Sequence, residues 1–161
     1  MSFPYREISK EEALNDYLKL RDDVRKNLDL STIGSKATDY YFQKKRSKTQ
    51  YKNKGSHFDN WKDPVKRKEI IEYAKKLRKT DNPTNDDLRA SMQFKYGSIN
   101  QFRPIVAKYI YKEFKPKRIL DFSAGWGGRL LAAMSLDIDY IGIDSNKSLK
   151  CILTSNCPVY N

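Results

Sequence analysis

The chain has 161 residues, of which 39% are hydrophobic and 32% are charged, and it contains 11 Tyr and 7 Phe. This length favours one domain or one and a half, and the aromatic content excludes a disordered chain. No stretch approaches about 18 uninterrupted apolar residues, and residues 1–10 lack an apolar signal core, so the sequence indicates neither a membrane span nor secretion. We therefore expect an intracellular protein, in the cytoplasm or the nucleus.

The net charge of +12 is unevenly distributed along the chain. From residue 118 onward four basic residues balance four acidic ones, so residues 1–117 carry the whole excess. A basic part beside a neutral part indicates that the first meets a polyanion while the second binds something else. The two cysteines, Cys151 and Cys157, have no further Cys or His nearby and predict neither a disulfide framework nor a metal site.

The first half of the chain predicts one helix and one long loop. Ser9 and Glu12 have the spacing of a capping box, and apolar residues then recur at helical spacing, which predicts an amphipathic helix over residues 10–28. Residues 31–61 are polar and basic without a clear period. We expect a loop there, with room for a short helix.

Three further helices are predicted before the neutral part. Asp63 caps a helix that starts at Pro64 and runs to about Lys79, and Thr84 caps another that ends at about Phe94. A last helix spans about Arg103 to Phe114, with a proline in its first turn. Its pattern predicts a buried face made of Ile105, Val106, Tyr109, Ile110 and Phe114.

The neutral part changes from helical to strand periodicity. Residues 118–122, "RILDF", predict a buried parallel strand, "SAGWGG" a turn, residues 129–136 a helix, and residues 139–144, "DYIGID", a second strand. This βαβ unit places its loops at the carboxyl ends of the strands, where ligands bind. Gly125 and Gly127 allow a ligand close to the backbone, and Asp144, 19 residues after Gly125, suits the hydroxyls of a ribose. The pattern therefore predicts a nucleoside site.

The residues around the glycines narrow the choice of nucleoside. Leu130 stands where a dinucleotide fingerprint needs Gly or Ala, and Arg129 stands where a phosphate-binding loop needs Lys, so NAD and ATP are disfavoured. Asp121 would repel a phosphate but suits an ammonium group, which points to S-adenosylmethionine. Two alternatives remain open: such turns also occur without a ligand, and Asp144 can cap a following helix.

Residues 119–131, "ILDFSAGWGGRLL", followed by "YIGID", resemble motifs I and II of class I S-adenosylmethionine-dependent methyltransferases, most closely the DNA (adenine or cytosine N-) methyltransferases of viral type. Residues 99–111, "INQFRPIVAKYIY", resemble the motif that these enzymes place before motif I. The resemblance covers about residues 98–148 and implies S-adenosylmethionine as cofactor. The implied cofactor-binding residues are Asn100, Gln101, Phe102, Asp121, Phe122, Gly125, Trp126, Gly127 and Asp144.

The chain also departs from this family. No two prolines are adjacent, so the catalytic Pro-Pro motif of the amino-methylating enzymes is absent, and only 17 residues follow motif II. We expect an α/β protein in which a basic, mainly helical region (residues 1–97) precedes an incomplete Rossmann-like domain of about two parallel strands (residues 98–161). A missing C-terminal segment or a partner chain would complete the sheet.

Basic and aromatic residues alternate between residues 40 and 61, as in proteins that grip phosphates and stack on bases. The candidate nucleic-acid-binding residues are Lys44, Lys45, Arg46, Lys48, Tyr51, Lys52 and Lys54. A solvated charged loop whose aromatic residues join the core is the alternative. Two functions therefore remain. One is the cofactor-binding portion of a nucleic-acid methyltransferase, for which we expect DNA as the target. The other is a non-catalytic nucleic-acid-binding protein with a relict methyltransferase half.

Overall fold

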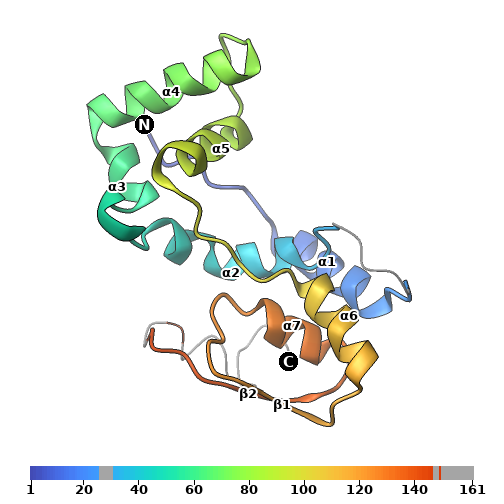
Figure 1. The fold of residues 1–161 in the computed structure, drawn as a ribbon. Helices are drawn as coiled ribbons and strands as arrows, with labels where there is room; N and C mark the ends of the chain where they lie inside the picture. Colours follow the sequence, from blue (N-terminus) through green and yellow to red (C-terminus); the bar gives the residue numbers. More distant parts are fainter. Residues whose placement is uncertain (26–30, 147–148, 150–161) are drawn as a thin grey trace. The chain divides into compact units, whose positions relative to one another are not determined.

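A computed structural model describes residues 1–25, 31–146 and 149. These residues form a mixed α/β structure, mostly helical, with a small parallel sheet late in the chain (Figure 1). The elements are α1 (Lys10–Asp22), α2 (Ser35–Ser47), the 3-10 helix η1 (Lys52–Lys54), α3 (His57–Lys62), α4 (Pro64–Arg78), α5 (Asn85–Tyr96), α6 (Pro104–Phe114), β1 (Arg118–Asp121), α7 (Gly128–Met134) and β2 (Asp139–Gly142). None of the helices in this part of the chain is long and apolar enough to cross a membrane.

The chain forms two compact units. The helical unit contains residues 1–7 and 43–100, and the sheet unit contains residues 8–42 and the chain from residue 101 onward. The boundary between them falls inside α2, and α1 belongs with the sheet unit. This division differs from the single boundary after residue 97 that we expect from the sequence. The cysteines, residues 26–28 of the first predicted helix and most of the segment after Asp144 lie outside the described residues.

The prediction of a long loop over residues 31–61 is wrong, because α2, η1 and α3 occupy most of it. The side chain that caps α2 comes from another helix: Asp16 Oδ2 of α1 accepts hydrogen bonds from the backbone N–H groups of Lys36 (2.8 Å) and Ala37 (3.2 Å). The buried face of α2 also includes small and polar residues, among them Thr38 and Asp39. Neither feature produces an apolar period in the sequence.

Helix α1 begins at its predicted capping box, where Ser9 and Glu12 exchange hydrogen bonds. It ends at Asp22, earlier than residue 28. The ammonium group of Lys108 on α6 donates to the carbonyl oxygens of Leu20 (2.5 Å), Arg21 (2.8 Å) and Asp23 (3.1 Å). The carbonyl of Leu20 also accepts the N–H of Asp23, the residue that follows α1, at 3.3 Å. Lys108 therefore supplies donors from another element to carbonyls at the end of α1.

The other predicted helices are confirmed with their caps. Asp63 accepts from Val65 and Lys66 at the start of α4, Thr84 forms a capping box at the start of α5, and Pro104 opens α6. The predicted buried face of α6 is partly wrong, since Ile110 and Phe114 are exposed. Ile105 and Leu131 share the core cluster of the sheet unit, so α6 packs on α7 through the face that carries Ile105.

The core of the helical unit joins α3, α4 and α5. Its buried residues are Trp61, Ile70, Ala74, Leu88 and Met92, and Phe3, Ile71 and Tyr96 pack against them. The Trp61 indole N–H donates to the carbonyl oxygen of Ser2 at 2.8 Å, which holds the N-terminal segment on this core. The unit therefore has its own hydrophobic centre.

His57 links α3 to the turn after α5, because its Nε2 lies 2.7 Å from the carbonyl oxygen of Gly97. Burial lowers the pKa of His57 below its ordinary value of 6.5, and the nearby Arg46 lowers it further, although the bond to Gly97 opposes both effects. The unfolded chain therefore binds this proton more readily than the folded chain does. Stability present above pH 6.5 is lost as the pH falls through 6.5 toward the lower folded pKa.

We expect the helical unit to unfold at lower urea concentration near pH 5.5 than near pH 7.5. The measurement uses Trp61 fluorescence in a Trp126→Phe background, in which Trp61 is the remaining tryptophan. His57→Gln keeps a donor for Gly97 and does not titrate, so its midpoint should change less over this range. Equal pH dependence in both proteins would contradict the role of His57.

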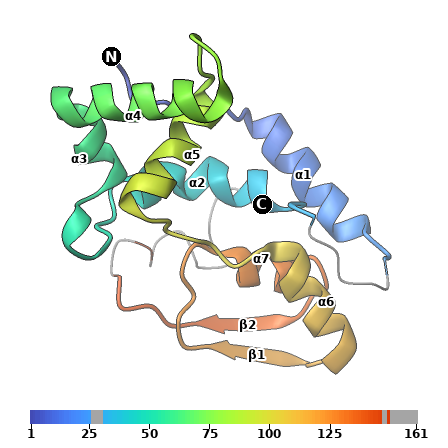
Figure 2. The ribbon, with the colours of Figure 1, turned by 45° about the horizontal axis from the view of Figure 1, so that its top comes forward.

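The sheet consists of β1 and β2, which pair in parallel with Leu120 opposite Ile141 and Asp121 opposite Gly142. Helices α6 and α7 lie on the same side of the two strands (Figure 2). The prediction of a buried strand is wrong for the face of the sheet opposite these helices, where Leu120 is 52% and Ile141 is 49% exposed. The physical reason is that no described element of the sheet unit covers this face.

Candidate cofactor and nucleic-acid sites

The glycine turn is fixed to the carboxyl ends of both strands. The Ile143 N–H donates to the carbonyl oxygen of Asp121 (2.7 Å), and the Ala124 N–H donates to that of Ile143 (2.9 Å). Asp144 then follows β2, and its Oδ2 accepts a hydrogen bond from the Gly125 N–H at 2.7 Å. The structure thus brings together three features that the sequence separates: Asp121, the glycines and Asp144.

The glycines of the turn have two different roles. Gly125 and Gly127 adopt positive φ angles of +56° and +75°, which L residues rarely adopt. A Cβ on Gly125 would meet only the carbonyl oxygen of Ser123, at 3.5 Å, so space is open beside it. A Cβ on Gly128 would overlap the carbonyl oxygen of Phe102. Gly128 therefore allows the segment before α6 to pack against the start of α7.

Asp144 is partly exposed, and each of its carboxylate oxygens accepts one backbone hydrogen bond. Oδ2 accepts from Gly125, and Oδ1 accepts from the N–H of Asn146 at 2.8 Å. A carboxylate offers about four acceptor positions, so roughly two remain for a ligand. The residues present therefore fit a ribose whose two hydroxyl groups donate to Asp144.

Asp121 is buried and already has partners within the sheet unit. Arg129 Nε donates to its Oδ2 at 2.6 Å, the Tyr140 hydroxyl donates to the same oxygen, and the Ser123 N–H donates to Oδ1 at 3.1 Å. Burial by itself raises the pKa of Asp121, but these three hydrogen bonds outweigh it and hold the pKa below its ordinary value. Asp121 is therefore a carboxylate paired with a guanidinium.

Three aromatic residues from the resemblance lie in different surroundings. The Phe102 ring faces the Arg129 guanidinium, whose carbon lies 5.1 Å from the ring centroid. Phe122 is 74% exposed. Trp126 packs edge-on against Phe42 of α2, with centroids 6.3 Å apart, so its ring has a packing contact as well as a place in the glycine turn.

Gln101 and Asn100 fall on opposite sides of the boundary between the units. Gln101 Oε1 accepts a hydrogen bond from the Thr38 hydroxyl of α2 at 3.0 Å, within the sheet unit. Asn100 belongs to the helical unit, where its Oδ1 accepts from the Ser98 hydroxyl at 2.6 Å. Of the nine candidate cofactor residues, the structure therefore describes eight in one unit.

Tyr140 is a site residue that our sequence reasoning missed. In the parallel register Asp121 lies opposite Gly142, and Tyr140, two residues before Gly142, projects to the same face. A Cβ on Gly142 would lie 2.8 Å from the Tyr140 ring, so this glycine makes room for the ring. Side chains two residues apart on a strand lie on the same face, so this spacing could have predicted that Tyr140 lies near Asp121.

The basic residues proposed to bind nucleic acid all belong to the helical unit. Lys44, Lys45 and Arg46 form the last turn of α2, and Lys52 and Lys54 lie in η1. The lysines also lie close to aromatic rings: Lys48 Nζ is 5.1 Å from the Phe58 centroid. Cation–π contacts of this length leave the charge near the surface, where it can still meet a phosphate.

Tyr51 has a structural contact in addition to its proposed role. A Cβ on Gly97 would overlap the Tyr51 ring, and Gly97 itself has a φ of +93°. Glycine at position 97 therefore lets the ring pack against the backbone after α5. This contact fixes η1, which begins at the next residue, to the end of α5.

Comparison of the chain with protein-family models, with curated proteins and with solved structures found no match.

Proposed function

We propose that the chain is the S-adenosylmethionine-binding portion of a nucleic-acid methyltransferase that acts on DNA. The observation that carries the proposal is the hydrogen bond from Gly125 to Asp144, since it joins a left-handed glycine turn to a carboxylate at the end of the next parallel strand. This is the arrangement in which α/β proteins bind the ribose of a nucleoside. Asp144 would hold the ribose, and the open side of Gly125 would admit the ligand.

Asp121 and Arg129 support the methionine end of the same ligand. A methionine moiety carries both an ammonium and a carboxylate, so the carboxylate of Asp121 and the guanidinium of Arg129 can each take one of its charges. S-adenosylmethionine would supply an activated methyl group. The role of this chain would be to bind and orient the cofactor.

The basic segment of the helical unit, residues 44–54, supports the nucleic-acid part of the proposal. Its lysines and aromatic residues have the composition that grips phosphates and stacks on bases. The exposed apolar face of the sheet supports the expectation that a further segment or a partner chain covers it. Leu120, Phe122, Ile141 and Ile143 are all exposed, and apolar sheet faces of this kind are normally covered.

A second candidate function is a non-catalytic nucleic-acid-binding protein with a relict methyltransferase half. The pairing of Asp121 with Arg129 and Tyr140 favours it, because these side chains already satisfy the carboxylate expected to meet the ligand. Under this alternative the glycine turn is an inherited scaffold. Only binding of the cofactor distinguishes the two functions.

The test is titration calorimetry of the chain with S-adenosylmethionine and S-adenosylhomocysteine. We expect micromolar binding to the wild type and at least about tenfold weaker binding to Asp144→Asn, which retains an acceptor for Gly125 but loses a charged acceptor for the ribose. Asp139→Asn is the matched control, since it removes an exposed charge from β2. No binding by the folded wild type would favour the second function, and sedimentation of the same samples would show whether a second copy covers the sheet.

A further inference from the structure

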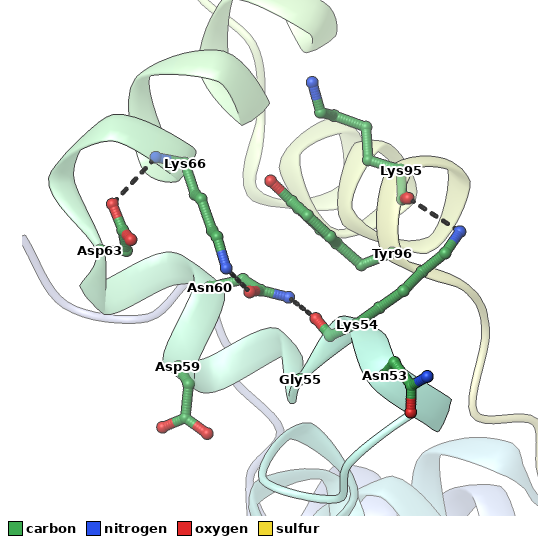
Figure 3. A pocket seen from close by; sticks show the side chains of 9 residues that line it. All are labelled: Asn53, Lys54, Gly55, Asp59, Asn60, Asp63, Lys66, Lys95 and Tyr96. Carbon is green, nitrogen blue, oxygen red and sulfur yellow. Dashed lines mark hydrogen bonds between the residues drawn. The ribbon is translucent and has the colours of Figure 1, made fainter.

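The helical unit contains a cleft of about 630 Å³ formed by η1, the residues around α3, the start of α4 and the end of α5 (Figure 3). Clefts that bind small ligands commonly measure about 300–1,000 Å³. The lining is polar and includes three lysines, Lys54, Lys66 and Lys95. The cleft is therefore large enough for a nucleotide, and its lysines can bind the phosphate.

Two of these lysines can offer donors to a ligand. Lys66 Nζ donates to Asn60 Oδ1 at 3.0 Å, and Lys54 Nζ donates to the carbonyl oxygen of Lys95 at 3.4 Å. An ammonium group has three N–H donors, so each retains capacity for a phosphate. Lys95 instead directs its ammonium toward Glu69, at 3.3 Å. Lys54 and Lys66 are thus the cations that face the cleft.

Asn60 fixes the position of both lysines. Its side chain is only 2% exposed, and its Nδ2 donates to the carbonyl oxygen of Lys54 at 2.9 Å while its Oδ1 accepts from Lys66. One buried amide therefore connects η1 to the first turn of α4. A site whose parts are held in place before binding loses less entropy when the ligand arrives.

The two carboxylates of the lining are used by the fold. Asp63 accepts from the N–H groups of Val65 and Lys66, and Asp59 accepts from the Ser56 hydroxyl at 2.6 Å. The positive end of the α4 dipole offsets the charge of Asp63, and Asp59 points away from Lys66 and Tyr96 in Figure 3. Their repulsion of an anion is correspondingly reduced.

Tyr96 supplies a flat surface between the two lysines. In Figure 3 its ring lies between the Lys66 side chain and the Lys54 side chain. Tyr96 is partly exposed, and its buried part packs against the core of the helical unit. A ring held in this way can stack on a base while the flanking ammonium groups bind the phosphate.

We propose that this cleft binds one nucleotide of a single-stranded nucleic acid, with the phosphate on Lys54 and Lys66 and the base against Tyr96. A single strand is favoured over a duplex because the faces of paired bases are not accessible to a ring in a cleft. The inference rests on the nucleic-acid part of the proposed function and makes it specific. Lys54 also ends the basic segment, so the cleft extends that surface.

The test is fluorescence anisotropy of the full chain with a labelled single strand of about 12 nucleotides and with the corresponding duplex. The double variant Lys54→Gln/Lys66→Gln should bind the single strand about tenfold more weakly. The slope of log affinity against log salt should fall by about 0.7, which is the value for one phosphate contact. Tyr96→Leu should lose at least about fivefold on the single strand and little on the duplex. The matched control is Lys68→Gln/Lys76→Gln, which removes the same charge from exposed positions of α4 outside the cleft.

Four results would overturn the inference. If the wild type binds but both cleft variants behave like the control, the basic segment alone contacts nucleic acid and the proposed function stands. If the variants lose affinity for the single strand and the duplex equally, the cleft binds a phosphate and not an unpaired base. If a free mononucleotide competes as well as the strand, the ligand is a nucleotide and not a strand. If the wild type binds no nucleic acid, that part of the proposed function fails too, whereas the calorimetry with S-adenosylmethionine reports on the cofactor site independently.

Discussion

Replacing Gly128 by alanine is expected to destabilise the sheet unit by about 3 kcal/mol. The added Cβ would overlap the carbonyl oxygen of Phe102 and lie 3.1 Å from its carbonyl carbon. Both atoms belong to the backbone that leads into α6, so no side chain can rotate away. Alanine favours helices over glycine by up to about 1 kcal/mol, which reduces the net effect but does not reverse it.

The measurement is urea unfolding followed by Trp126 fluorescence in a Trp61→Phe background, because Trp126 then reports on the sheet unit alone. Gly125→Ala is the matched control. It places alanine at a positive φ but meets only Ser123 at an ordinary distance, so about 1 kcal/mol is expected. If Gly128→Ala is no less stable than this control, the close approach of Phe102 does not limit the packing of α6 against α7.

Replacing Lys108 by methionine is expected to cost about 2 kcal/mol of stability in the same unit. Lys108 is 2% exposed, and its ammonium donates to three carbonyl oxygens at the end of α1. Methionine has a similar length but removes the side-chain donor from all three carbonyls, of which Leu20 keeps the bond from the Asp23 N–H at 3.3 Å. It also removes a cation from the negative end of the helix dipole. The desolvation cost of a buried ammonium, which methionine avoids, keeps the expected loss from being larger.

Lys112→Met is the control for this variant. Lys112 lies on the same helix and reaches one carbonyl oxygen, that of Arg25, at 3.4 Å in an exposed contact. Its replacement should change stability by less than about 0.5 kcal/mol. Equal unfolding midpoints for Lys108→Met and Lys112→Met in the Trp126 assay would show that Lys108 does not hold α1 to α6.

Helices with local signals could be predicted from the sequence. Ser9, Asp63 and Thr84 cap α1, α4 and α5 through atoms two or three residues away, and such contacts are visible in any sequence. The parallel pairing of β1 with β2 was also predicted, since two short apolar runs joined by a glycine turn and a helix form a βαβ unit. These features depend on residues that are near neighbours in the chain.

The candidate sites were predicted only in part. The spacing of Asp144 and Gly125 indicated that they meet, and they form a hydrogen bond. The partners of Asp121 were not predicted, because Arg129 and Tyr140 reach it from α7 and β2 across the turn. The cleft beside Tyr96 could not be predicted at all, since its lining comes from separate segments between residues 53 and 96.

By itself the sequence determined the capped helices, the βαβ unit and the glycine turn, because these depend on backbone preferences and on side chains a few residues apart. Only the tertiary structure decided where α1 ends, that α2 is a helix, and which atoms Asp121 contacts. In each case the deciding group is distant in sequence: Lys108 for α1, Asp16 for α2 and Tyr140 for Asp121. Hydrogen bonds and burial act over a few ångströms in space, and a linear pattern does not record which distant residues will come that close.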